Sequence, residues 1–309
     1  MRIIKLIFKF FFFLVFILVS MVIVTYFRNI NNHISLSNSD IMLYIETADE
    51  ASQGKLQVNW KHLAAIDGVR YKRDFSKATS ESIRELADIF IEKKSTSHDD
   101  KGRGYRLKSI DEILVELRFD EKQTNNVHKY LVDLEHEGLN KKRLAPDSPY
   151  MEFIDEITDE AIAMYNEYGV FPSITIAQAI LESGWGKSDL SIKANNLFGI
   201  KADKYWGGAY ISMQTTEYHD EQVKSNFRKY ESKSASLEDH GKFIYDNKRY
   251  RNNGVFDATY YVDQAEALER AGYSTKENEN GEKIYAELLI NLIRQYNLQL
   301  IDHEVQSCL

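Results

Sequence analysis

A glutamate at the end of an apolar helix is the first residue of this sequence whose position points to catalysis. Ser173 is expected to cap a helix over 174–183, which Gly184 ends, so that Glu182 lies in the last turn. The negative end of the helix dipole and burial against the nearby Trp185 would both raise the pKa of Glu182. A carboxyl group that stays protonated near neutral pH is suited to protonate a glycosidic oxygen. Taken alone, a glutamate at a helix end is more often a solvated residue, so the surrounding sequence decides.

The segments on either side of this helix predict a mainly helical domain with a small β lobe. Ser148 and Pro149 form a helix start, and Gly169 closes the apolar stripe that follows them. Farther along, residues 209–218 and 223–230 are expected to be strands joined by a turn over 219–222, although no Asn-Gly or Asp-Gly marks that turn. We place this catalytic domain at 150–302.

The preceding part of the chain predicts a separate helical accessory domain over 37–139. Ser109 and Glu112 form a capping box, and Gly138 is expected to close the last helix of this domain. Pro146 and Pro149 fall in a polar stretch that we assign as a linker over 140–149. The stretch 58–67 faintly resembles the first active-site helix of lysozyme-like transglycosylases but lacks their Glu-Ser pair, so we expect no catalysis from this domain.

The N-terminal segment predicts a membrane anchor. Residues 10–27 are almost wholly apolar and are long enough to span a bilayer as a helix. Arg2, Lys5 and Lys9 precede the segment and only Arg28 follows it, which predicts a cytoplasmic tail over 1–9 and an extracellular position, facing the cell wall, for the bulk of the chain. The alternative is a cleaved signal peptide, for which no good cleavage site follows.

Composition narrows the possible partners. The chain has 309 residues and a net charge of −8, with 39 basic and 47 acidic residues, which argues against nucleic acid. Cys308 is the only cysteine, which excludes an internal disulfide and a cysteine metal site.

The sequence motifs around Glu182 resemble those of the glucosaminidase family, glycoside hydrolase family 73, which includes Gram-positive autolysins. The most specific pair is AQAILESGWG at 177–186 followed by NNLFGIK at 195–201. The resemblance covers about 152–300 and continues through TTEY at 215–218, FRKY at 227–230, NKRY at 247–250, ALERAGYST at 267–275 and YA at 285–286. It implies a lysozyme-like fold with a small β lobe and chemistry that needs no cofactor or metal.

The resemblance also assigns catalytic residues. Glu182 matches the general acid of the family, Glu217 matches a second carboxylate on the β lobe, and Tyr273 matches a tyrosine near the acid. A second carboxylate would activate water or orient the 2-acetamido group of the substrate, and the sequence does not decide between these roles. The competing interpretation of Glu217 is a solvated strand residue beside Asp220 and Glu221.

Other residues of the same region are candidates for substrate binding. Asn195 and Asn196 would hydrogen-bond acetamido groups or, alternatively, cap turns. Aromatic side chains would stack on sugar faces or, alternatively, fill the core; they are Phe198, Trp206, Tyr210, Tyr250 and Tyr285.

These features together predict a peptidoglycan hydrolase whose substrate is the glycan strand of the cell wall. By resemblance it is an endo-β-N-acetylglucosaminidase that cleaves the β-1,4 bond between GlcNAc and MurNAc. A lytic transglycosylase or muramidase that cleaves after MurNAc, and a non-catalytic wall-binding protein, are the two alternatives.

Overall fold

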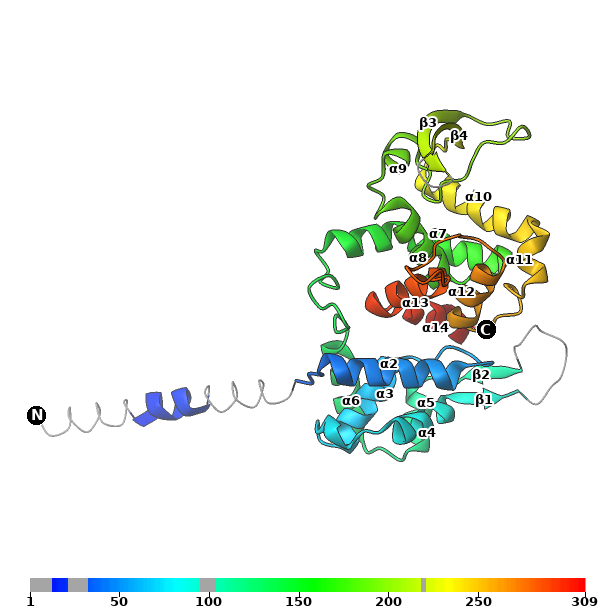
Figure 1. Cartoon of the computed structure of the whole chain (residues 1–309). Coiled ribbons are helices and arrows are strands. Elements are labelled where there is room, and N and C mark those ends of the chain that lie inside the picture. The colour runs from blue at the N-terminus through cyan, green and yellow to red at the C-terminus, as the bar shows by residue number, and fades with distance from the viewer. Residues whose placement is uncertain (1–12, 22–32, 95–103, 218–220, 309) are drawn as a thin grey trace, which may run out of the picture.

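The computed structural model describes residues 13–21, 33–94, 104–217 and 221–308. Apart from 13–21, these residues fold into a lower and an upper helical unit (Figure 1). Half of the expected anchor over 10–27 lies outside the described residues, and its described part, 13–21, is helical. Within the described ranges, no helix combines the length and the apolar character that a membrane crossing requires.

The lower unit is helical with one short hairpin. Its core gathers large side chains that include Tyr44, Trp60, Leu63, Ile83 and Phe90. The strands of the hairpin pair antiparallel, with Ile91 opposite Leu107. Its elements are α2 (Asn38–Ser52), α3 (Trp60–Arg70), the 3₁₀ helix η1 (Phe75–Lys77), α4 (Ser80–Phe90), β1 (Ile91–Lys93), β2 (Tyr105–Leu107), α5 (Ile110–Glu116) and α6 (Glu121–Asp133).

Of two helix-end predictions for this unit, the capping box at Ser109 is confirmed and the helix end at Gly138 is not. The capping box is confirmed, since Glu112 N donates to Ser109 Oγ and Ser109 N donates to Glu112 Oε2 at 2.7 Å. The prediction that Gly138 closes the last helix of this unit is wrong, because α6 already ends at Asp133. A Cβ at Gly138 would lie 2.4 Å from Leu144 Cδ1 and 2.7 Å from Asn297 Nδ2. This glycine is therefore needed for the close approach of those two side chains, not for a left-handed helix end.

The upper unit is an array of helices with a second two-stranded hairpin. As expected, Ser148 caps its first helix and Gly169 ends that helix at a φ of 77°. The elements are α7 (Pro149–Tyr168), α8 (Pro172–Ser183), α9 (Asp189–Ala194), β3 (Tyr210–Glu217), β4 (Glu221–Arg228), α10 (Lys233–Asp246), α11 (Lys248–Asn252), α12 (Tyr261–Arg270), α13 (Tyr285–Gln295) and α14 (Gln299–Ser307).

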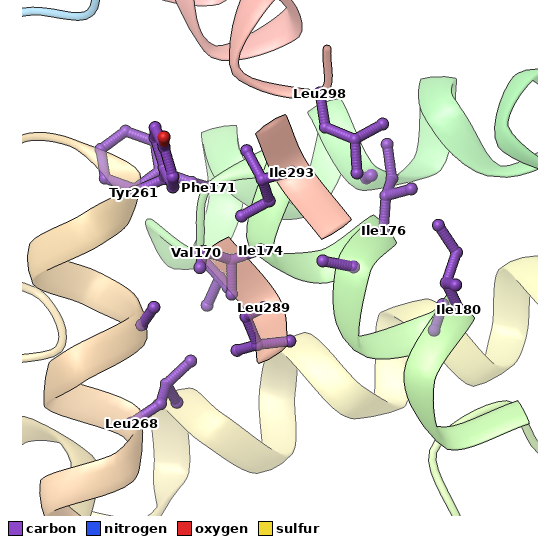
Figure 2. Close-up of a cluster of buried hydrophobic side chains, with 14 of the residues drawn as sticks. Val170, Phe171, Ile174, Ile176, Ile180, Tyr261, Leu268, Leu289, Ile293 and Leu298 are labelled. Atoms are coloured by element: carbon purple, nitrogen blue, oxygen red, sulfur yellow. The ribbon is translucent and has the colours of Figure 1, made fainter. Parts of the chain in front are cut away.

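Helix α8 is the central helix of this unit. Figure 2 shows Ile174 and Ile180 of α8 in one cluster with Leu289 and Ile293 of α13, and all four are buried. Burial of several such side chains, at roughly 1.5–3 kcal/mol each, fixes the two helices against one another. The packing therefore determines how the end of α8, with Glu182, faces the start of α13, with Tyr285.

The hairpin of the upper unit forms a small lobe of its own. Its strands run antiparallel from the pair Tyr210–Arg228 to the pair Glu217–Glu221, close to the predicted strand positions. In Figure 1 it lies above α9 and α10. Arg228 binds Asp239 of α10 through two hydrogen bonds of 2.8 and 2.9 Å, and the Tyr230 hydroxyl donates to the same carboxylate. The lobe is thus held to α10 by charged and polar contacts.

The two units share a buried polar contact surface, which we call the seam. Asp49 of α2 accepts hydrogen bonds from the Tyr261 hydroxyl at 2.5 Å and from Arg294 Nε at 3.0 Å. Trp60 Nε1 donates to Asn297 Oδ1 at 3.3 Å. Unpaired buried polar groups are costly, so each unit supplies partners that the other one needs. The stretch 140–149 also joins the contact, because Arg143 donates to the Tyr296 hydroxyl at 2.7 Å.

Ser173 does not cap α8, contrary to expectation. The helix begins one residue earlier, at Pro172, and its N-cap Phe171 makes no side-chain capping bond. Ser173 instead donates to the buried Asp302 of α14, from its backbone N at 2.9 Å and from its hydroxyl at 2.5 Å. Ser173 is the second residue of α8, where a backbone N–H has no acceptor within the helix, so its N–H and its hydroxyl are both available to that carboxyl group.

Asp302 gives the fold a pH dependence that can be measured. Burial raises its pKa to about 7, so the folded protein favours the protonated form. Stability is therefore full below the unfolded pKa near 4 and decreases as pH rises through about 7. We expect Asp302→Asn, which cannot ionise, to gain roughly 2–4 kcal/mol in free energy of unfolding relative to the parent between pH 4.5 and 8.

Urea unfolding of both proteins at the two pH values measures that difference. Burial also raises the pKa of Asp49 to about 6, with the same sign, and Asp49 is present in both proteins. Its charge helps to raise the pKa of Asp302, so the measured difference includes this repulsion. A difference between parent and Asp302→Asn that is the same at both pH values would contradict the assignment.

Candidate active site

Glu182 occupies the last turn of α8, where three residues in a row leave the helical conformation. Gly184, Trp185 and Gly186 have φ values of 57°, 64° and 68°, and Gly186 N donates to Ser183 Oγ at 2.7 Å. This turn sends the Trp185 ring onto Tyr150 and Tyr296, with centroids 4.7 and 4.8 Å away. Trp185 therefore packs α8 onto its neighbours. The aromatic residue that forms a hydrogen bond with Glu182 is Tyr285.

The carboxyl group of Glu182 is half-buried and bonded to a phenol. The Tyr285 hydroxyl donates to Glu182 Oε1 at 3.1 Å. Burial raises the pKa of Glu182 above its ordinary value, while the charge of Lys276 and the hydrogen bond from Tyr285 act in the opposite direction. Because burial is the largest of these effects, the site stabilises the protonated form relative to a glutamate in water, which is the direction that a general acid needs.

An aromatic row extends from Tyr285 to α10. The Tyr273 ring stacks on Tyr285 at 5.3 Å, and its hydroxyl lies 3.1 Å from His240 Nε2. His240 in turn stacks on Phe198 at 3.7 Å. Burial lowers the pKa of His240 to about 3, so its ring is neutral and makes an uncharged hydrogen bond. Tyr285 thus lies beside Glu182 and Phe198 lies at the far end of the row. Both rings are buried, which favours the core interpretation of these two residues over sugar stacking.

Three side chains of this region were not assigned from the sequence. Gln178 donates through Nε2 to the Tyr285 hydroxyl at 3.0 Å, and Lys276 acts on Glu182 through its charge. The third is His240. The sequence could have placed Gln178 near the acid, since it lies four residues before Glu182 and therefore on the same helix face. Lys276 and His240 come from distant segments, and no local pattern links them to Glu182.

Glu217 is the last residue of β3 and pairs in register with Glu221 of β4. It therefore belongs to the hairpin lobe, as expected for the second carboxylate.

Asn195 and Asn196 hold the chain between α9 and the lobe. Asn195 has a left-handed conformation and donates through Nδ2 to Tyr230 O at 3.1 Å. The buried Asn196 donates through Nδ2 to Ile200 O and Arg228 O and accepts from Ile200 N, at 2.9–3.1 Å. These bonds favour the capping interpretation of both amides over direct binding of substrate.

We expect Asn196→Ala to loosen the lobe. The change removes three hydrogen bonds to backbone groups, at roughly 0.5–1.5 kcal/mol each. Ile200 O keeps the bond that it accepts from Arg228 N at 3.0 Å, whereas Ile200 N loses the acceptor that Asn196 provides. The midpoint of thermal unfolding should fall by several degrees, and the turnover rate should fall because Glu217 is carried by the loosened lobe. Hydrogen exchange of the β3 and β4 amides measures the loosening. Unchanged exchange in the variant would show that Asn196 is not what anchors the lobe.

The remaining aromatic candidates lie in different environments. Trp206 donates through Nε1 to Ala209 O, and the Arg228 guanidinium lies 4.4 Å from its ring. It borders an open hollow of about 500 Å³ between its loop and α10, which Phe243 also lines. The Tyr210 side chain is 59% exposed, whereas Tyr250 is fully buried and belongs to the core. Trp206 and Tyr210 are therefore open to a ligand. Tyr250 packs against Tyr273, with the two ring centroids 6.1 Å apart.

Comparison with known proteins agrees with this site. Residues 158–298 match the glucosaminidase family model, described as mannosyl-glycoprotein endo-beta-N-acetylglucosaminidase. Exo-glucosaminidase LytG of Bacillus subtilis is 37% identical over 48% of this chain and 52% of its own length. Peptidoglycan hydrolase FlgJ of Salmonella typhimurium is 30% identical over 68% of this chain and 66% of its own length.

A solved structure is similar in sequence over the same region. The catalytic domain of the autolysin Auto from Listeria monocytogenes is 34% identical, with a TM-score of 0.44, and the match covers 51% of this chain and 89% of that domain. The chain spans between a quarter and two thirds of the length of the curated relatives it matches. Through residues 158–298, which contain Glu182, Tyr273 and Tyr285, the chain belongs to the glucosaminidase family.

Proposed function

We propose that the protein is a peptidoglycan hydrolase that cleaves the β-1,4 bond between GlcNAc and MurNAc. The observation that carries the proposal is the half-buried Glu182, whose pKa burial raises and whose Oε1 accepts a hydrogen bond from Tyr285. In this role Glu182 donates a proton to the glycosidic oxygen as the bond breaks, and the leaving sugar departs as an alcohol. The sugar ring then carries positive charge, which a second group must stabilise.

Glu217 is the proposed second group. It either takes a proton from the attacking water or orients the substrate's own acetamido group, which attacks the anomeric carbon instead. Its position at the end of β3, on a lobe separate from the helix that carries Glu182, supports a role distinct from that of the acid. Tyr273, stacked on Tyr285 beside the acid, is proposed to contact the reacting sugar. Trp206 and Tyr210 are proposed to stack on sugar rings farther along the strand.

The enzyme is proposed to be endo-acting, which means that it cleaves bonds inside the glycan strand. One relative, LytG, is named an exo-glucosaminidase, which makes removal of terminal sugars the second candidate. The two differ in product size, because endo cleavage releases long fragments early and exo cleavage releases small sugars from the start.

Product analysis tests the bond specificity. Purified peptidoglycan is digested, the fragments are reduced with borohydride, and their ends are identified by mass spectrometry. The proposal expects reduced GlcNAc at the new ends. Reduced MurNAc would indicate a muramidase, and 1,6-anhydro-MurNAc would indicate a lytic transglycosylase. Binding to peptidoglycan with no new ends would support the wall-binding alternative.

The location of the protein is proposed from the sequence alone. The apolar stretch 10–27, with basic residues mainly before it, would anchor the chain in the membrane and leave residues 33–309 facing the wall. External protease added to wall-stripped cells should then degrade the protein. Full protection would reject this orientation. Residues 37–139 are proposed as a non-catalytic module that supports the hydrolase through the seam.

A further inference from the structure

Gln178 is a fully buried polar residue directly behind the proposed acid. It lies one helical turn before Glu182 on α8, and its Nε2 lies 3.0 Å from the hydroxyl of Tyr285. Tyr285 is itself buried, and its hydroxyl lies 3.1 Å from Glu182 Oε1. The three side chains therefore form a chain of two hydrogen bonds that ends on the carboxyl group.

The amide fixes the direction of both bonds. An amide NH₂ group only donates, so the phenol oxygen accepts from Gln178. A phenol has a single proton, which Tyr285 is then free to give only to Glu182 Oε1. Burial raises the pKa of Tyr285 well above its ordinary value, so this proton is present across the working pH range.

The opposite amide orientation is less favourable in this environment. As assigned, Gln178 leaves one buried carbonyl oxygen, Oε1, without a partner among the described residues. If the amide were flipped, its NH₂ group would take that unpartnered position and lose the acceptor it has now. Both amide N–H donors would then lack partners, whereas the assigned orientation leaves one N–H and the carbonyl oxygen without partners in the described part of the chain.

We propose that Gln178 is a positioning residue which, through Tyr285, keeps Glu182 Oε1 as an acceptor, so that Glu182 carries its transferable proton on Oε2. This inference rests on the proposed role of Glu182 as general acid. Without the amide, the Tyr285 oxygen would be free to accept the acid's own proton. The proton would then be held on Oε1 against the core and would not be directed to the substrate.

The arrangement has a consequence for the pH profile. The described groups that act on the charge of Glu182 are Lys276, Tyr285 and Tyr273. Donation from Tyr285 stabilises the carboxylate, so its loss raises the pKa of Glu182. The alkaline limb of the rate, where the acid loses its proton, then moves to higher pH. Loss of Gln178 has the same sign, because Tyr285 then becomes able to accept from the protonated acid.

The test is the pH dependence of kcat/KM on a soluble peptidoglycan fragment for the parent, Gln178→Met, Tyr285→Phe and the double variant. Tyr285→Phe should raise the alkaline limb by about 0.5–1 pH unit and lower the plateau by about tenfold. Gln178→Met should move the limb in the same direction. The double variant should match Tyr285→Phe alone, because Gln178 acts only through that phenol.

A matched control separates this effect from a general loss of packing. Tyr261→Phe also removes a buried phenol that donates to a carboxylate, Asp49, but at the seam. It should lower the melting temperature and leave the alkaline limb unmoved. If Gln178→Met does not fold, Gln178→Leu replaces it in the comparison, because Tyr285→Phe alone does not test the amide.

Three outcomes would overturn the inference: an unmoved limb in Tyr285→Phe, a plateau loss in Gln178→Met without a limb shift, or additive effects in the double variant. Glu182→Gln is measured in parallel to separate these results from the proposed function. If Glu182→Gln keeps the parent rate, the proposed function fails. If Glu182→Gln is inactive and the limb does not move, only the role of Gln178 fails.

Discussion

Glu182→Gln is expected to lower the rate of peptidoglycan cleavage by about 10² to 10⁴-fold. Glutamine keeps the size of the side chain and still offers an oxygen to the Tyr285 hydroxyl, but it has no proton to transfer. The fold should not be weakened, because the change removes a half-buried carboxyl from the negative end of α8. The measurement is the rate at which reducing ends appear in digests of purified peptidoglycan, together with the melting temperature.

Two controls make this result specific. Glu304→Gln changes another glutamate whose pKa burial raises, on α14, and should leave the rate unchanged. An aryl glycoside of a chitooligosaccharide with a strongly acidic phenol as leaving group needs little protonation, so Glu182→Gln should lose much less of its rate on that substrate. Equal losses on both substrates would show that Glu182 is not the proton donor.

The second large effect is expected at the seam. Trp60 of α3 is only 1% exposed, and its indole donates to Asn297 in the upper unit. Trp60→Ala should lower the free energy of unfolding by about 3–5 kcal/mol, because it opens a cavity and leaves the Asn297 oxygen unpaired. Since the seam joins both units, their unfolding should shift together to lower urea concentration.

Urea titrations followed by far-ultraviolet circular dichroism and by residual cleavage activity measure this coupling. Val132→Ala is the control, because Val132 is 69% exposed and its truncation should change stability by less than about 0.5 kcal/mol. Activity that outlasts the main loss of helix in Trp60→Ala would mean that the upper unit folds independently of the lower one.

The sequence predicted local structure well where a single residue determines it. The cap at Ser148, the helix end at Gly169 and the capping box at Ser109 are confirmed because each depends on groups within a few residues. Ser173 and Gly138 were assigned wrongly because their partners, Asp302 and Asn297, lie more than a hundred residues away. Residue spacing carries no information about such distant partners.

The same division applies to the site. The end position of Glu182 on its helix follows from local pattern, and the packing of α8 on α13 is what gives it Tyr285 as a partner. From the sequence, burial against Trp185 is expected to raise the pKa of Glu182. In the structure Trp185 packs on Tyr150 instead, and the pKa is raised by the general burial of the carboxyl group, which lies beside Tyr285. The direction of the shift was correct, and its cause depended on tertiary contacts.

The most direct test of the account is the pH profile of kcat/KM for the parent protein and Glu182→Gln on the same soluble peptidoglycan fragment. If Glu182 is the acid, the activity of the parent falls at an alkaline limb whose pKa lies above the ordinary value for a glutamic acid. This limb should also be missing from whatever activity remains in Glu182→Gln. A parent profile without such a limb, or the same limb in both proteins, would contradict the assignment of Glu182 as the acid.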